Sequence, residues 1–108
     1  MSPELVWTRG AESDLCAIYQ ELEEFNSDSG ERLVLLIDAS LQLLRQFPEM
    51  APVYAPPIRR LVLHQGRYGL FYTIEHRRII LHAVADLRSG PDVLKSRFRK
   101  LLGDTERR

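Results

Sequence analysis

A chain of 108 residues, of which 44 % are hydrophobic and 28 % charged, can bury one core, so we expect a single domain over residues 1–108. No apolar run approaches the about 20 residues of a membrane span, and the N-terminus lacks the features of a signal peptide, which indicates a cytoplasmic protein. The formal net charge of zero excludes little, because the charge is unevenly distributed along the chain.

The first part of the chain is predicted to form a short strand and a helix. Leu5–Trp7 is β-prone, and Thr8 can cap the helix that follows. The apolar positions of this helix recur at steps of three and four, at Ala11, Leu15, Ile18, Leu22 and Phe25. Residues 26–30 break the helix, and Asp28 with Glu31 resembles a capping box for a second helix.

The second helix has a wider apolar sector and should be more buried than the first. Its apolar face consists of Leu33, Leu36, Ile37, Leu41 and Leu44. The helix ends at Phe47–Pro48, because proline disfavours helical geometry in the residue before it. Residues 48–57 hold four of the six prolines, so we expect an extended connection that is neither a helix nor an inner strand.

Three strands follow, at Ile58–His64, Tyr68–Glu75 and Arg78–Asp86, and the short turns between them predict antiparallel pairing. Pro91 begins a last helix, which Gly103 ends. The predicted fold class is α+β: a helical hairpin on one face of a four-stranded, mainly antiparallel sheet in the order β-α-α-β-β-β, with a C-terminal helix.

Two groups of side chains on the predicted strands could serve a site. Strict alternation places Arg78, His82 and Asp86 on one face, which fits either an acid–base site or a hydrogen-bonded structural cluster. Arg59 and Arg60 point to opposite faces if both lie in a strand. The chain has one cysteine, three dispersed histidines and no phosphate-binding loop or nucleophile elbow, so we expect neither a metal nor a cofactor.

The charge differs strongly between the two halves of the chain. Residues 1–56 carry three Arg against ten acids, a net charge of −7, and residues 57–108 carry ten Arg and two Lys against five acids, a net charge of +7. Such asymmetry indicates an acidic or polyanionic partner for the basic half, unless the two halves neutralise each other in the fold.

Several short motifs, in this order, resemble the RelE/ParE superfamily of bacterial toxins. They are Trp7–Leu15, Ile18–Tyr19, Leu44, Phe47–Pro48, Ile58–Leu61, Tyr68–Tyr72 and Ala83–Pro91. The resemblance covers about residues 4 to 101 and is closer to the ParE branch. It implies the toxin of a type II toxin–antitoxin pair, neutralised by a cognate antitoxin protein.

The two branches of the superfamily differ in what the resemblance implies. RelE-like members cleave messenger RNA in the ribosome, and their arginine in the third-strand motif and their C-terminal tyrosine fall on Gly69 and Leu94 here. Their arginine after the last strand is matched by Arg88, whereas Arg59 and Arg60 are the nearest basic groups to their lysines. The ParE branch lacks this catalytic set and inhibits DNA gyrase through protein contact, which is the function we expect here.

Two alternatives remain open, a ribosome-dependent mRNA endoribonuclease and a non-toxic relic that only binds an antitoxin. The ribonuclease would draw its catalytic groups from Arg59, Arg60, Arg67, Arg78, His82 and Arg88. The expected partner-binding residues are Arg60, Arg67, Arg78, Arg88 and Arg99. The favoured function requires contact with the antitoxin and gyrase, and none with a membrane.

Overall fold

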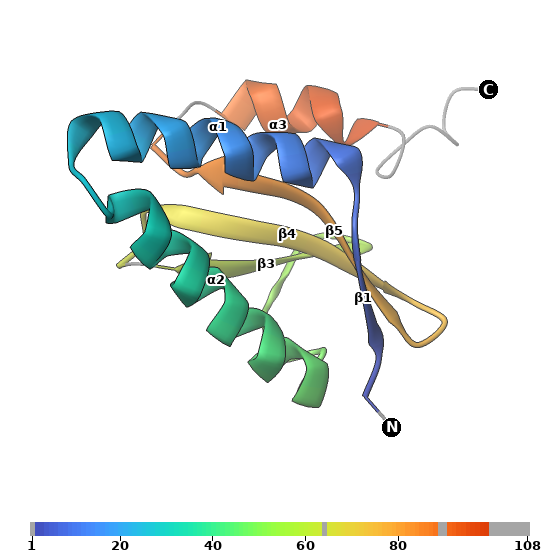
Figure 1. Cartoon of the computed structure of the whole chain (residues 1–108). Helices are drawn as coiled ribbons and strands as arrows, with labels where there is room; N and C mark the ends of the chain where they lie inside the picture. Colours follow the sequence, from blue (N-terminus) through green and yellow to red (C-terminus); the bar gives the residue numbers. More distant parts are fainter. Residues whose placement is uncertain (1, 64, 89–90, 100–108) are drawn as a thin grey trace.

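The computed structural model describes residues 2–63, 65–88 and 91–99 (Figure 1). Its elements in chain order are β1 (Glu4–Trp7), α1 (Arg9–Phe25), α2 (Ser29–Gln46), β2 (Val53–Ala55), β3 (Ile58–Leu63), β4 (Tyr68–Glu75), β5 (Arg78–Asp86) and α3 (Pro91–Arg97). No helix within these described ranges is long and apolar enough to cross a membrane.

The strands form one mixed sheet in the order β1-β5-β4-β3-β2. β1 runs parallel to β5, and the other neighbours are antiparallel, which confirms the predicted α+β fold. The sheet has one strand more than we expected, because β2 lies inside the proline-rich segment. β2 has three residues and occupies the edge of the sheet, where the missing N–H groups of nearby prolines are tolerated.

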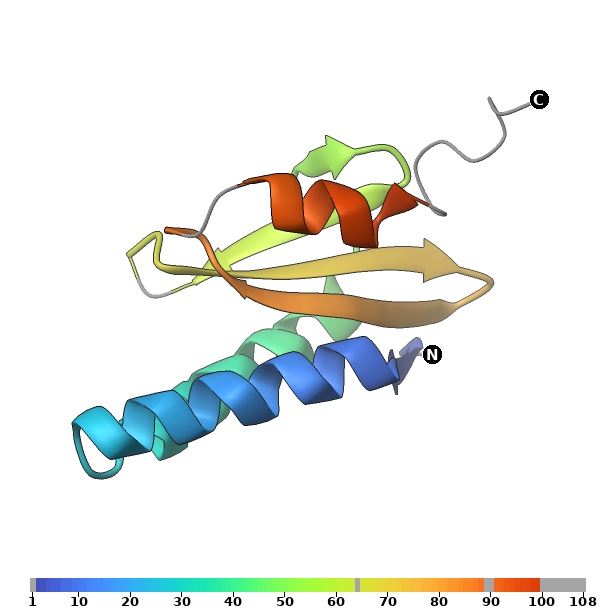
Figure 2. The same ribbon diagram turned by 90° about the horizontal axis from the view of Figure 1, so that it is seen from above.

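α1 and α2 cover one face of the sheet, as the helical spacing predicts (Figure 2). The buried residues of this core include Leu33, Ile37, Leu41 and Leu44 from α2 and Tyr68, Leu70, Tyr72, Ile79 and Leu81 from the sheet. α1 contributes one fully buried residue, Ala11, so α2 is the more buried helix, as predicted. The Tyr72 hydroxyl donates to the Pro48 carbonyl at 2.7 Å and thereby ties the end of α2 to the sheet.

The two hairpin helices begin differently from one another. The Thr8 hydroxyl accepts the backbone N–H of Ala11 at 3.1 Å, as a predicted N-cap should. The capping box at Asp28 was wrong, because Asp28 makes no side-chain cap and adopts a left-handed φ of 72°. The Glu23 carboxylate takes over that role from the preceding helix and accepts the N–H of Gly30 at 2.8 Å.

Phe25 belongs to the predicted apolar face of the first helix, but it is not buried with the rest of that face. Its surface is 91 % exposed. The reason is that α1 ends at this residue, and the turn into α2 projects beyond the sheet (Figures 1 and 2). The spacing of apolar residues shows which face of a helix a residue occupies, but it does not show where along the helix the sheet ends.

α3 lies on the opposite face of the sheet, over a second apolar cluster (Figure 2). Phe98 and Leu94 meet Ile58, Phe71 and Ala83 there, and the Phe71 and Phe98 ring centroids are 5.4 Å apart. The predicted end of this helix at residue 103 lies outside the described residues. The sheet is therefore covered on both faces, by the hairpin on one and by α3 on the other.

Candidate partner-binding site

Two of the predicted arginines meet at one end of the sheet. Arg67 lies in the turn before β4, and Arg88 follows the end of β5. The pairing of β4 with β5 sets Tyr68 opposite Asp86, and the Leu87 N–H donates to the Arg67 carbonyl at 2.7 Å. The strand register therefore brings together two cations that are 21 positions apart in the chain.

Asp86 lies between these two cations. The Arg88 guanidinium forms two hydrogen bonds to its carboxylate, from Nη2 at 2.8 Å and from Nε at 3.0 Å, and Arg67 Nε is 4.0 Å away. The hydrogen bonds from Arg88 hold the pKa of Asp86 below its usual value, against the opposing effect of burial. Because the Arg88 side chain is 65 % exposed, this ion pair orients a cation that a partner can still reach.

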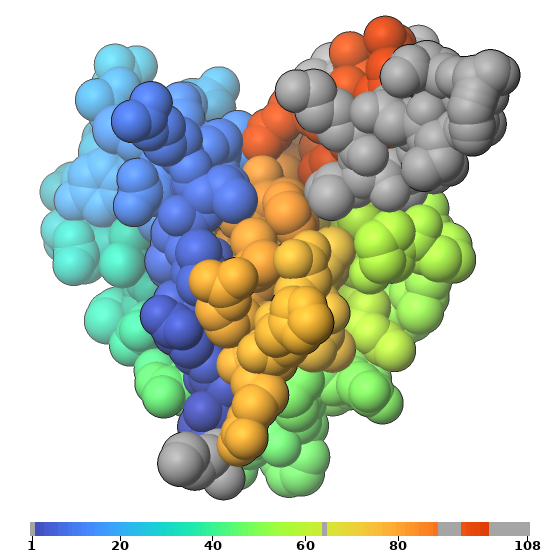
Figure 3. Space-filling model, turned by 90° about the vertical axis from the view of Figure 1, so that its right-hand side faces the viewer, coloured from blue at the N-terminus to red at the C-terminus, as the bar shows by residue number. Residues whose placement is uncertain are grey.

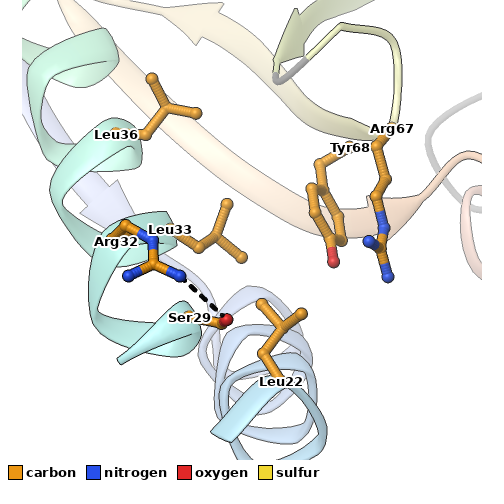
Figure 4. Close-up of a pocket in the computed structure, with 7 residues that line it drawn as sticks. All are labelled: Leu22, Ser29, Arg32, Leu33, Leu36, Arg67 and Tyr68. Atoms are coloured by element: carbon orange, nitrogen blue, oxygen red, sulfur yellow. Dashed lines mark hydrogen bonds between the residues drawn. The ribbon is translucent and has the colours of Figure 1, made fainter. Parts of the chain in front are cut away.

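A cleft of about 290 Å³ opens beside Arg67, between the helical hairpin and the start of β4 (Figure 4). It is lined by Leu22, Ser29, Arg32, Leu33, Leu36, Arg67 and Tyr68. The Arg67 guanidinium lies 5.0 Å from the centre of the Tyr68 ring, and Arg32 donates to the Ser29 hydroxyl at 3.2 Å. Apolar walls with two guanidinium groups suit an amphipathic segment that carries carboxylates.

The predicted group of Arg78, His82 and Asp86 is split by a β-bulge, so its assignment to one face was wrong. Phe71 pairs with Ala83 and Tyr72 with Leu81, which leaves His82 as the extra residue of β5. Beyond His82 the side chains of β5 alternate again between the two faces, but with the faces exchanged. Val84 accordingly joins the core under the hairpin, and Ala83 joins the cluster under α3.

His82 is half-buried at the bulge and has a defined partner. Its Nε2 lies 2.9 Å from the Thr73 hydroxyl, which in turn donates to the Glu75 carboxylate at 3.2 Å. Burial lowers the pKa of His82, the Glu75 carboxylate opposes this shift, and the Arg97 cation adds to it. A neutral imidazole bound to a threonine is a structural contact, but its members are Thr73 and Glu75 rather than the predicted Arg78 and Asp86.

Arg97 is a structurally important residue that the sequence did not indicate. Its Nη1 donates to both carboxylate oxygens of Asp14 at 2.8 Å, and its Nη2 donates to the His82 carbonyl at 2.8 Å. Asp14 also accepts the backbone N–H of Val84 at 2.9 Å. The pair therefore satisfies the backbone at the bulge and joins α1, β5 and α3, across 83 positions that no local pattern spans.

The other predicted arginines lie on different parts of the surface. Arg59 donates to the Ala51 carbonyl at 2.7 Å, on the side of the hairpin. Arg60 lies 5.3 Å over the Tyr54 ring, on the side of α3, so the two do point to opposite faces. Arg99 is exposed beyond the end of α3.

Arg78 lies at the end of the sheet remote from Arg67 and Arg88. It is exposed and begins β5, beside the β4–β5 turn that faces the viewer in Figure 3. The eight residues of β4 span roughly 23 Å at about 3.3 Å per residue, which is the separation of the two ends. Of the six cationic partner or catalytic candidates, the structure thus brings together only Arg67 and Arg88 within its described residues. Those described residues also contain no group of three or more His, Cys, Asp or Glu that could hold a metal ion.

A protein-family model matches most of the chain. The sequence model described as "ParE toxin of type II toxin-antitoxin system, parDE" matches residues 5–90. No curated protein matches the chain.

Several solved structures resemble the fold, including the following two. A chain from the chromosomal ParDE toxin–antitoxin system of P. aeruginosa superposes with a TM-score of 0.69 at 22 % identity, over 79 % of this chain and 96 % of that one. A doubly substituted variant of the E. coli toxin RelE in the free state gives a TM-score of 0.60 at 16 % identity, over 94 % and 100 %. At these identities the likeness establishes a common fold.

Proposed function

The chain belongs to the ParE toxin family of type II toxin–antitoxin systems, and from this premise we propose that it acts by binding DNA gyrase as a protein inhibitor. Membership of the family makes it a toxin with a cognate antitoxin as its partner. The resemblance to the ParE branch implies gyrase as the target and contact, rather than cleavage, as the mode of action.

The observation that carries this proposal is the dispersal of the groups that RNA cleavage would need. Cleavage through a 2′-hydroxyl requires a proton acceptor, a proton donor and cations around one phosphate. His82 is bound to Thr73 and its pKa is lowered, while Arg78 and Arg88 lie at opposite ends of the sheet. This arrangement supports an inhibitor that works by protein contact.

The surroundings of Gly69 also favour the ParE branch over the RelE branch. The position at which RelE carries an arginine is occupied here by a glycine against neighbouring side chains. A Cβ at Gly69 would lie 3.1 Å from Leu87 Cδ2 and 3.2 Å from Phe71 Cε1. A side chain at this position would require the Leu87 and Phe71 side chains to shift by a few tenths of an ångström, which favours the glycine.

For the antitoxin, we place the main contact at the cleft beside Arg67. An acidic, amphipathic segment that folds on binding would set apolar side chains against Leu33 and Leu36 and a carboxylate against Arg67. A further carboxylate could reach Arg88, which shares Asp86 with Arg67 outside the cleft. The remaining predicted contacts, Arg60, Arg78 and Arg99, lie on other parts of the surface. A segment would reach them only by continuing around the sheet.

The test of the proposed function compares two targets. The purified protein is incubated with gyrase and relaxed plasmid, and separately with ribosomes programmed with mRNA. Inhibited supercoiling with intact mRNA is the expected result. Cleaved mRNA that disappears in His82→Ala or Arg88→Ala would replace the proposal with ribonuclease activity, and failure of both assays would favour a non-toxic relic.

A further inference from the structure

The turn between α1 and α2 presents an aromatic side chain to solvent. Phe25 is 91 % exposed at the last position of α1, where the turn projects beyond the sheet (Figures 1 and 2). It does not line the cleft beside Arg67. A single exposed apolar residue is ordinary on a protein surface. A binding role for Phe25 therefore has to be argued from the residues around it.

The turn that carries Phe25 is held in one conformation. One carboxylate oxygen of Glu23 accepts the backbone N–H groups of Gly30 at 2.8 Å and Glu31 at 3.2 Å. The other oxygen accepts that of Asp28 at 3.2 Å, and the Asn26 N–H donates to the Leu22 carbonyl at 2.9 Å. These bonds order the turn before any partner arrives, so that binding through it costs little further conformational entropy.

The two helices are also fixed at close range behind the turn. A Cβ at Gly30 would lie 2.8 Å from the Tyr19 ring and 2.9 Å from the Tyr19 carbonyl oxygen, so only glycine allows this approach. The Tyr19 hydroxyl donates to the Glu31 carboxylate at 3.1 Å across the same junction. Phe25 thus lies next to a turn whose backbone and helix junction are held by hydrogen bonds and close packing.

The rim around Phe25 is acidic. Glu21, Glu24 and Asp28 are all exposed within four positions of it. Arg32 is the next cation along the chain, and it is bound to Ser29 at 3.2 Å. An acidic rim repels phosphates and fits a protein surface whose own rim carries Lys or Arg.

We propose that the α1–α2 turn is the element with which this toxin docks on its protein target, and that Phe25 enters an apolar pocket with a basic rim on that target. The inference rests on the proposed function, in which the toxin acts by protein contact. The proposal also explains how a bound antitoxin could prevent the toxin from reaching its target. The cleft shares its edge with the turn at Leu22 and Ser29, so a segment bound in the cleft obstructs the approach of the target to Phe25.

The test compares Phe25→Ala with Leu35→Ala, which removes a side chain that is 63 % exposed on α2. Both variants are produced as full chains with the antitoxin, which is then removed, and their melting temperatures and antitoxin affinities are measured. We expect both values to stay near those of the unaltered chain. For Phe25→Ala alone, the concentration that half-inhibits supercoiling should rise by about 10-fold or more, as for a central aromatic anchor.

Growth arrest after induced expression separates this inference from the choice of target. If the unaltered chain arrests growth and leaves gyrase active, the gyrase proposal fails, and loss of arrest in Phe25→Ala still supports the docking turn. Glu24→Lys should weaken the same readouts by charge repulsion. Full toxicity and full inhibition by a folded Phe25→Ala variant would overturn the inference, as would an unaltered chain that shows neither effect.

Discussion

At the scale of single residues, carboxylates of the acidic half serve as partners for the backbone. Glu23 accepts three N–H groups at the start of α2, and Asp14 accepts the N–H of Val84 beside the bulge. Both contacts join residues that are distant in the sequence or separated by a turn. Composition alone therefore overstates how much of this acidic charge is free to face solvent.

Replacement of Glu23 by alanine should destabilise the protein by about 1–2 kcal/mol, because three backbone donors at a helix N-terminus lose their acceptor. Urea unfolding followed by circular dichroism measures the effect. Glu24→Ala, one position away and exposed, is the matched control and should change the free energy of unfolding little. Equal stabilities of the two variants would contradict the capping role.

His82 should make stability depend on pH. Burial lowers the pKa of His82 in the folded state, whereas the unfolded chain has the ordinary histidine pKa of about 6.5. Below that pH the unfolded state binds more protons than the folded state, so protonation favours unfolding. The free energy of unfolding should therefore fall as the pH is lowered from 7 to 5. His82→Gln should flatten this dependence in urea titrations at several pH values. An unchanged dependence would show that His82 does not titrate differently on folding.

At the scale of elements, the sequence predicted those features that depend on the spacing of apolar residues within one helix or strand. The helical spacing of Leu33, Ile37 and Leu41 and the short turns between strands led to the correct helices, pairings and core. Alternation failed at His82, because a bulge inserts one residue and shifts every later side chain to the other face. Asp14 and Arg97 bind the backbone at the bulge, and both lie outside β5 along the chain, so the alternation pattern of the strand could not reveal the bulge.

Leu41→Ala should cost about 2–5 kcal/mol, because Leu41 is 4 % exposed in the core between α2 and the sheet. Leu35→Ala, on the exposed side of the same helix, should leave the stability nearly unchanged. Thermal and urea unfolding of both variants measure the difference. A Leu41→Ala variant that melts with the unaltered chain would refute the assignment of the core.

At the scale of the molecule, the acidic and basic halves of the chain are in contact through few charged groups. Within the described ranges, Arg97–Asp14 is the ion pair that joins the acidic half to the basic half, while Arg67 and Arg88 share Asp86 from their own half. The cleft could not be predicted from the sequence, since its two cations come from α2 and from the turn before β4. The acidic partner that the sequence indicates for the basic half stays a prediction.

Association with the antitoxin should slow as the salt concentration rises, because opposite potentials accelerate encounter and ions screen them. Stopped-flow or surface-plasmon measurements between low and physiological ionic strength give the rate constant. Arg67→Ala should lower the on-rate more than Arg78→Ala, which removes a cation at the far end of the sheet. An on-rate that is independent of salt would remove the electrostatic part of this account.

The most direct measurement is a gyrase supercoiling assay with and without antitoxin, run on the unaltered chain, Arg67→Ala and the exposed α3 control Lys95→Ala. If the antitoxin binds the cleft and the target binds the neighbouring turn, all three chains should inhibit supercoiling equally. The antitoxin concentration that restores gyrase should then rise about 10-fold or more for Arg67→Ala alone, in line with the loss of an arginine anchor at an interface. Equal rescue of all three chains, or loss of inhibition by Arg67→Ala, would contradict the separation of the two surfaces.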